Sequence, residues 1–312
     1  MLTLCSAIFY YGKKLAQPER KTLQDYHQEW LKTPNNHGIS ITKSIYLDGK
    51  VPCLIAAPDP SSQLGTRGEI VRNQLTERGC KLVAHGDIIG TIVLLHGRNG
   101  RKEDLLPVAE RYCAAGFRCI IPDLPAHGES PVESVQFGGS DWEKEFPYKL
   151  LLECSDTHDF SASPAALWGM SMGGSFATHS AATGAPWSSV TIVSSFDRLS
   201  TVIENKCRLN FISRATAWVC QLSGGADINQ INPCERAKEV TAPVMVAHGT
   251  ADSLINLSQG KTLYNSFTSP QKKWVEVNGG THSHVLTTPM PLYATMIEWA
   301  LTHLHETNEN KL

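Results

Sequence analysis

The sequence predicts an α/β protein whose mostly parallel sheet is covered by helices on both faces. Short apolar runs alternate with stretches of helical period through most of the 312 residues. The runs show little polar alternation, which is typical of strands that are buried on both faces. A chain of this length buries one large core, so a single α/β domain is expected.

Residues 1–38 are interpreted as an N-terminal extension. Residues 2–11 are mostly apolar and precede Lys13 and Lys14. The run is too short to span a bilayer, and its cations follow it, unlike those of a secretory signal. It is therefore either a short helix docked on the domain, which we favour, or the tail of a longer membrane anchor. Apolar positions in residues 17–32 have helical spacing and predict a surface helix.

The main domain is expected over residues 39–312. Residues 39–47 and 51–57 alternate around an Asp-Gly-Lys turn, a pattern typical of a β-hairpin. Residues 58–90 contain Pro, Ser and Gly beside a stretch of helical character at 69–78. We interpret them as an insertion between the second and third strands.

The parallel core follows this insertion. Its strands are expected at residues 91–95, 117–122, 165–168, 189–194, 242–248 and 273–277, and helices at 104–115 and 289–305. A polar linker is expected before the strand at 165–168. Residues 196–240 have aromatic residues and cysteines but no clear strand, so we expect a cap over the strand ends.

The charge and cysteine content exclude several classes of protein. The net charge of -2 gives no electrostatic case for nucleic acid or for an anionic membrane surface. The nine cysteines include no Cys-x-x-Cys pair, which argues against zinc-knuckle and thioredoxin-type sites. Free buried thiols are expected, and a cytoplasmic location is favoured. Export stays open, and with it one disulfide among Cys207, Cys220 and Cys234.

A Gly-x-Ser-x-Gly motif at residues 169–173 follows one of these strands and precedes a stretch that can open a helix. Glycines on both sides let the strand and helix approach closely, and the helix N-terminus favours negative charge beside Ser171. The motif alone does not distinguish a nucleophile from an ordinary loop serine.

A serine nucleophile needs a base to take its proton and an acceptor to orient that base. Asp252 and His282 each follow a predicted strand, and strand ends meet at one edge of a parallel sheet. Their order along the chain, with Ser171 first, is that of this strand–turn–helix type of site. Asp197 is the alternative acid and His284 the alternative base.

Acyl transfer also requires N–H donors for the oxyanion. Met172, directly after the serine, and Arg98, in the loop after the strand at 91–95, are expected to supply them from the backbone. Another strand ends in Asp-Leu-Pro-Ala-His-Gly-Glu-Ser at 123–130. These residue types occur in metal sites, but no further ligand cluster accompanies them, so we interpret the segment as a loop brace.

Together these segments resemble the α/β-hydrolase superfamily, and within it the branch of serine esterases, lipases and S33-type aminopeptidases. The resemblance extends from about residue 39 to 305. It rests on the motifs at residues 95–98, 123–130, 169–174, 248–252 and 280–282.

The resemblance implies an eight-stranded, mostly parallel sheet and no cofactor or metal. It also implies Ser171 as nucleophile, His282 as base, Asp252 as its orienter, and Arg98 and Met172 as oxyanion donors. The insertion at residues 58–90 is longer than the usual connection. The cap at 196–240 is short for a lipase lid, which favours a small acyl pocket.

The first hypothesis for function is a serine hydrolase that cleaves carboxylic esters of small to medium acyl chain through an acyl-enzyme. A peptidase or amidase would also need acids for the substrate amine, and Asp227 and Glu235 are the candidates. Acyl transfer and a non-catalytic binding role are further alternatives. Dehalogenases and epoxide hydrolases of this fold have Asp where Ser171 stands and are disfavoured. A small-molecule ester or amide is the expected partner, while membrane association and oligomeric state stay open.

Overall fold

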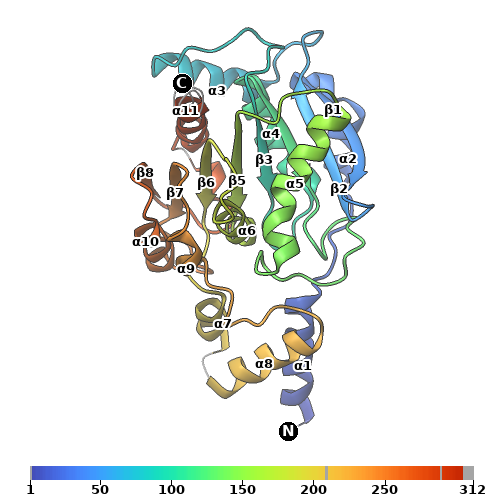
Figure 1. Ribbon diagram of the computed structural model, residues 1–312, viewed down its shortest axis with the longest axis vertical. Coiled ribbons are helices and arrows are strands. Elements are labelled where there is room, and N and C mark those ends of the chain that lie inside the picture. The colour runs from blue at the N-terminus through green and yellow to red at the C-terminus, as the bar shows by residue number, and fades with distance from the viewer. Residues whose placement is uncertain (1, 208–209, 289, 305–312) are drawn as a thin grey trace.

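The computed structural model describes residues 2–207, 210–288 and 290–304, which form an eight-stranded sheet with helices on both faces (Figure 1). The strand order is β1-β2-β4-β3-β5-β6-β7-β8. β2 runs antiparallel to both β1 and β4, and the other neighbours are parallel. The predicted fold class is confirmed.

The strands lie close to the predicted positions. They are β1 (Ile39–Tyr46), β2 (Val51–Pro58), β3 (Gly90–Leu95), β4 (Phe117–Pro122), β5 (Ala165–Met170), β6 (Ser189–Val193), β7 (Val244–Gly249) and β8 (Lys272–Val277).

Eleven α-helices in the described part of the chain cover the sheet or extend beyond it. They are α1 (Leu2–Ala16), α2 (Asp25–Lys32), α3 (Thr66–Glu77), α4 (Leu106–Ala114), α5 (Asp141–Thr157), α6 (Met172–Ala181), α7 (Leu199–Cys207), α8 (Asn210–Leu222), α9 (Pro233–Ala237), α10 (Leu257–Ser266) and α11 (Leu292–Leu304).

Two apolar cores lie on opposite faces of the sheet. In β3, Val93 and Leu95 join the core beneath α5 and α6, whereas Ile92 and Leu94 join the core beneath α3, α4 and α11. Both faces are therefore buried. This explains why the sequence of β3 is an uninterrupted apolar run.

Three expectations about helices need correction. The polar linker expected before β5 contains α5, a 17-residue helix whose N-cap is Ser140. Phe146, Leu150 and Leu151 are buried, while charged residues and an internal Pro147 obscure the helical pattern in the sequence. The helix expected at 17–32 is limited to α2, and α10 was not predicted. The closing helix is α11, and Pro289 and His305 lie outside the described residues.

The N-terminal helix joins the cap in one lobe. α1 packs against α8, and α7 lies beside them, apart from the sheet (Figure 1). The contact is close, because a Cβ on Gly12 would lie 2.5 Å from the Cβ of Val219. Residues 2–11 thus belong to a docked helix. No helix in the described part of the chain has the length and apolar character required to cross a membrane.

Candidate active site

Ser171 lies on the turn between β5 and α6 in a strained conformation, with φ 54 and ψ -118. The flanking glycines permit this turn. A Cβ on Gly169 would lie 2.1 Å from the carbonyl oxygen of Gly173, and a Cβ on Gly173 would lie 2.1 Å from that of Leu95. The Ser171 N–H donates to the Val193 carbonyl at 2.8 Å, which ties the turn to β6. The sequence folds here into the sharp strand-to-helix turn that presents a serine hydroxyl.

The structure brings Ser171, His282 and Asp252 together from the ends of β5, β8 and β7. His282 Nε2 lies 3.0 Å from Ser171 Oγ, and His282 Nδ1 lies 2.7 Å from Asp252 Oδ2. Both distances are within hydrogen-bond range. We call these three residues the Ser-His-Asp cluster.

The Asp252 carboxylate is fixed from its other side. Its Oδ1 accepts hydrogen bonds from the N–H groups of Leu254 at 3.0 Å and Ile255 at 2.9 Å. Burial acts to raise the pKa of Asp252, but the hydrogen bonds from His282 and Ile255 outweigh it and hold this pKa below its ordinary value. The carboxylate is therefore ionised at neutral pH and can accept a hydrogen bond from the imidazole N–H of His282.

The alternative acid and base lie elsewhere. Asp197 accepts hydrogen bonds from the Arg198 N–H at 2.7 Å and from Gln259 at 3.1 Å, with no bond to His282. His284 is exposed, and its Nδ1 lies 3.2 Å from Thr281 Oγ1. Of the two acids and two histidines, only His282 lies within hydrogen-bond range of Ser171, and only Asp252 lies within range of His282 Nδ1.

Arg98 and Met172, whose backbone N–H groups are the expected oxyanion donors, line the same cavity as Ser171. Met172 is the first residue of α6, so its N–H has no partner within the helix. The Arg98 N–H donates to no acceptor in the described part of the chain. The Arg98 side chain turns away, and its guanidinium donates to the carbonyls of Lys14 and Leu15 at the end of α1. Burial lowers the pKa of Arg98 to about 10, so it stays charged.

A cavity of about 1290 Å³ lies between the strand ends and the helical lobe. Both Ser171 and His282 line it, and α1, α7 and α8 supply 12 of the other 25 lining residues. The apolar side chains from these helices are Leu4, Ala7, Ile8, Leu15, Leu199, Val202, Ile203 and Ile212. Such a cavity suits a ligand with a large apolar part.

Sequence reasoning missed the contribution of α1 to the cavity. The signal was present, because Leu4, Ile8, Tyr11 and Leu15 recur at the spacing of one helix face. The expected cap at residues 196–240 therefore forms only part of the cover. This addition makes the cavity larger than the small acyl pocket that the short cap predicted.

The acids proposed for binding a substrate amine do not reach the cavity. Neither Asp227 nor Glu235 lines it, and Glu235 pairs with Lys238 at 2.8 Å. Among the described residues that line it, Glu19 is the one acid, and it pairs with Lys14 at 2.7 Å.

The segment after β4 is held by buried ion pairs. Lys102 Nζ lies 2.6 Å from Asp123 Oδ2 and 2.8 Å from Glu129 Oε2, and Asp123 also accepts the N–H groups of Lys102 and Glu129. These bonds fix the loop beside the residues that follow β3, as a brace would. In the described part of the chain, no group of His, Cys, Asp and Glu has an arrangement that could hold a metal ion.

The cysteines with described side chains are free thiols, Cys220 and Cys234 among them. These two residues therefore do not form the disulfide that the sequence left open. The side chain of Cys207 lies outside the described residues.

We expect acid to destabilise the fold through two buried histidines. Burial lowers the pKa of His127 to about 3 and that of His179 to about 4, from an ordinary 6.5. In each ring Nδ1 lies 2.8 Å from a backbone carbonyl, and Nε2 of His127 has no partner in the described structure. A second proton would bury an unpaired N–H. Above pH 6.5 these histidines should not reduce the free energy of unfolding. Below pH 6.5 that free energy should fall, by about 2 kcal/mol per histidine at pH 5.

Urea unfolding at pH 7.5 and pH 5 measures this loss. His127→Asn, which retains an N–H for the Pro125 carbonyl, should lose less stability on acidification than the wild type, by about 2 kcal/mol. The control is His284→Asn at an exposed position. Equal acid losses in wild type and His127→Asn would contradict the assignment.

Comparison with known proteins identifies the family. The sequence matches the family model described as "Alpha/beta hydrolase family" over residues 92–295. The chain belongs to the α/β-hydrolase family. The matched region of the chain extends from β3 into α11 and includes all three residues of the Ser-His-Asp cluster. A search of curated proteins finds no significant match to the chain.

Solved structures with the same fold include several hydrolases. An esterase of Pyrococcus furiosus has 13% identity and a TM-score of 0.63, covering 92% of this chain and 100% of that chain. A 2,6-dihydroxy-pseudo-oxynicotine hydrolase has 14% identity and a TM-score of 0.62, covering 97% of this chain and 80% of that chain. A monoacylglycerol lipase of Paleococcus ferrophilus has 19% identity and a TM-score of 0.52, covering 70% of this chain and 96% of that chain. At these identities the likeness establishes the fold.

Proposed function

We propose that this hydrolase cleaves carboxylic esters through an acyl-enzyme on Ser171. The observation that carries the proposal is the hydrogen-bonded chain of the Ser-His-Asp cluster, with Ser171 Oγ 3.0 Å from His282 Nε2 and His282 Nδ1 2.7 Å from Asp252. Esterases and a lipase among the proteins of the same fold agree with it.

In the first half of the reaction, Ser171 Oγ attacks the ester carbonyl carbon and its proton passes to His282 Nε2. The Asp252 carboxylate orients the ring and stabilises the imidazolium. The oxyanion accepts hydrogen bonds from the N–H groups of Met172 and Arg98. The alcohol then leaves with the proton from His282, and Ser171 remains acylated.

In the second half, water replaces the alcohol. His282 takes a proton from the water, whose oxygen attacks the acyl carbon while the same N–H donors stabilise the second oxyanion. The carboxylic acid is released and Ser171 regains its proton. Each step uses only the ester, water and side chains already in place.

The cavity favours an ester over a peptide with a free amine. An aminopeptidase requires an unpaired acid near the reacting carbonyl, whereas Glu19 is paired and Asp227 and Glu235 lie outside the lining. The apolar walls from α1, α7 and α8 suit an acyl chain of medium length. Burying each CH₂ contributes about 0.8 kcal/mol, or roughly fourfold in kcat/KM, until the cavity is filled.

A hydrolysis panel tests this function. We expect kcat/KM to rise from p-nitrophenyl acetate through butyrate to octanoate, and aminoacyl-p-nitroanilides to be at least about 100-fold poorer. The Ser171→Ala protein supplies the blank. Faster turnover of the anilides would instead support the peptidase alternative. A preference for acetate would contradict the large apolar acyl site.

A further inference from the structure

The outer face of α1 and α8 carries large apolar side chains in solvent. Phe9 and Tyr10 on α1 are 60% and 50% exposed, and Phe211, Trp218 and Leu222 on α8 are 60%, 64% and 67% exposed. We call these five residues the cap patch. Contiguous exposed apolar surface of this kind marks an interaction site.

Three residues of the cap patch lie together across the two helices. Phe9, Trp218 and Leu222 line one shallow hollow of about 490 Å³, together with Lys13. None of them lines the cavity at Ser171. α1 is thus apolar on two sides, with one side against the cavity and the cap patch facing outward.

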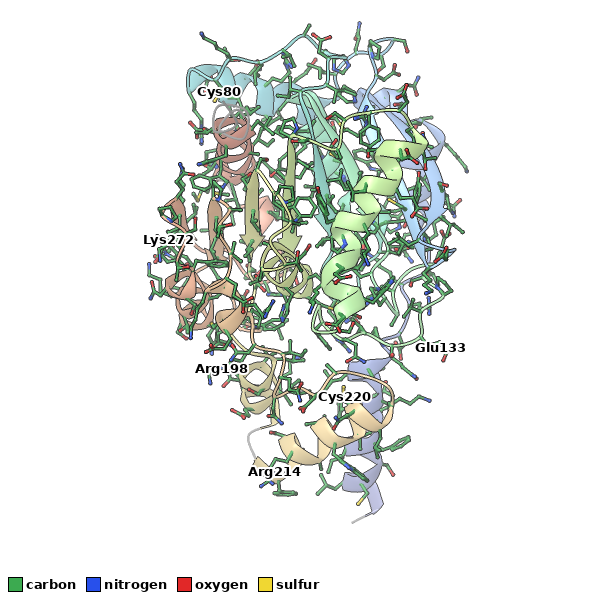
Figure 2. All side chains as sticks on the ribbon, in the orientation of Figure 1. Cys80, Glu133, Arg198, Arg214, Cys220 and Lys272 are labelled. Atoms are coloured by element: carbon green, nitrogen blue, oxygen red, sulfur yellow. The ribbon has the colours of Figure 1, made fainter. Side chains whose placement is uncertain are left out.

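The charged residues on the two helices that carry the cap patch have one sign. α1 and α8 together contain Lys13, Lys14 and Arg214 and no Asp or Glu. Lys14 pairs with Glu19, whereas Lys13 and Arg214 are exposed and have no ion-pair partner in the described part of the chain. Figure 2 shows Arg214 in the lobe apart from the sheet. A whole-chain charge of -2 conceals this local excess of cations.

We propose that the cap patch binds the surface of an anionic lipid bilayer. Aromatic side chains on an amphipathic helix enter the headgroup region, and neighbouring Lys and Arg residues are attracted to anionic lipids. A symmetric contact with a second copy is less suitable, because it would place Lys13 and Arg214 of both copies at one interface. The positive charges of Lys13 and Arg214 therefore favour an anionic lipid surface over a second copy of the chain.

This binding would place the catalytic cavity beside the lipid, a consequence that rests on the proposed esterase function. Tyr11 lines the cavity and is 62% exposed, and it follows Phe9 and Tyr10 directly on α1. An apolar ester dissolved in the bilayer would enter between α1 and the strand ends with little transfer through water.

Vesicle flotation with the full chain tests the proposal, and Ser171→Ala protein is used so that hydrolysis plays no part. We expect binding to phosphatidylcholine vesicles to increase at least about tenfold when phosphatidylserine is added. The Phe9→Ser/Trp218→Ser and Lys13→Glu/Arg214→Glu variants should each lose at least about tenfold of that binding. Trp218→Phe should remove most of the blue shift in tryptophan fluorescence that vesicles produce.

Matched controls lie far from the cap patch. Ile70→Ser replaces a 53% exposed apolar residue on α3, at the opposite end of the sheet (Figure 1). Lys81→Glu/Lys273→Glu reverses two exposed charges elsewhere. These variants should bind as the parent does, and thermal unfolding verifies that all variants are folded.

Three results would overturn the proposal. They are equal binding to neutral and anionic vesicles, anionic binding that survives both cap-patch variants, and a dimer in light scattering that Phe9→Ser/Trp218→Ser dissociates. A failure of the vesicle experiment leaves p-nitrophenyl ester turnover in solution unaffected. The two proposals are therefore tested separately.

Discussion

Replacing Ser171 by alanine is expected to lower kcat for p-nitrophenyl esters by about 10⁵- to 10⁶-fold. The variant lacks the only hydroxyl that is hydrogen-bonded to His282 among the described residues, so no acyl-enzyme can form. The cavity remains, as do the N–H groups of Arg98 and Met172 that we propose as oxyanion donors, and together they should sustain a residual rate above that of water. Binding of a non-hydrolysed ester analogue should change little.

The measurement is steady-state turnover combined with labelling by a fluorophosphonate, which reacts with an activated serine. Wild type should be labelled and Ser171→Ala should not. Ser175→Ala is the matched control, because Ser175 lies on α6, the helix that follows Ser171, but donates to the Phe137 carbonyl at 2.7 Å. The kcat of Ser175→Ala should stay within a few-fold of the wild-type value. Turnover that persists in Ser171→Ala would show that another residue is the nucleophile.

The parts of the site that the sequence predicted are those that depend on local pattern. Strand ends were recognisable from apolar runs, and in a parallel sheet the residues after them must meet at one edge. Ser171, Asp252 and His282 lie together for that reason. Both His282 and His284 follow the same strand, and the sequence favoured His282 because a flexible Gly-Gly-Thr turn precedes it. In the structure His282 is the ring whose Nε2 lies 3.0 Å from Ser171 Oγ.

The sequence predicted a docked helix at residues 2–11 and a cap at 196–240, but not that the two pack together in one lobe. Contact between α1 and α8 joins segments about 200 residues apart, as in the close approach of Gly12 to Val219. No local pattern records such a pairing. Helix α5 was missed because Pro147 and its charged face obscure a helical period that burial makes evident. The net charge of the whole chain also gave no sign of the local excess of cations on α1 and α8.

Asp252 is the residue whose replacement best separates orientation from attack. In Asp252→Asn the N–H groups of Leu254 and Ile255, at 3.0 and 2.9 Å in the wild type, should retain the amide oxygen as their acceptor. The amide NH₂ then faces His282 Nδ1, which must accept. The proton moves to Nε2, the nitrogen that has to receive the proton of Ser171.

We therefore expect Asp252→Asn to lower kcat by about 10⁴-fold while KM changes little. The control is Asp197→Asn, at an acid of similar position that hydrogen-bonds Gln259 rather than His282, and its kcat should stay within a few-fold of the wild type. A small effect at Asp252 with a large one at Asp197 would reverse the assignment. Equal losses in both would indicate that structural damage, rather than the tautomer of His282, limits the rate. Thermal unfolding of both variants distinguishes that case, because loss of tautomer control leaves the fold intact.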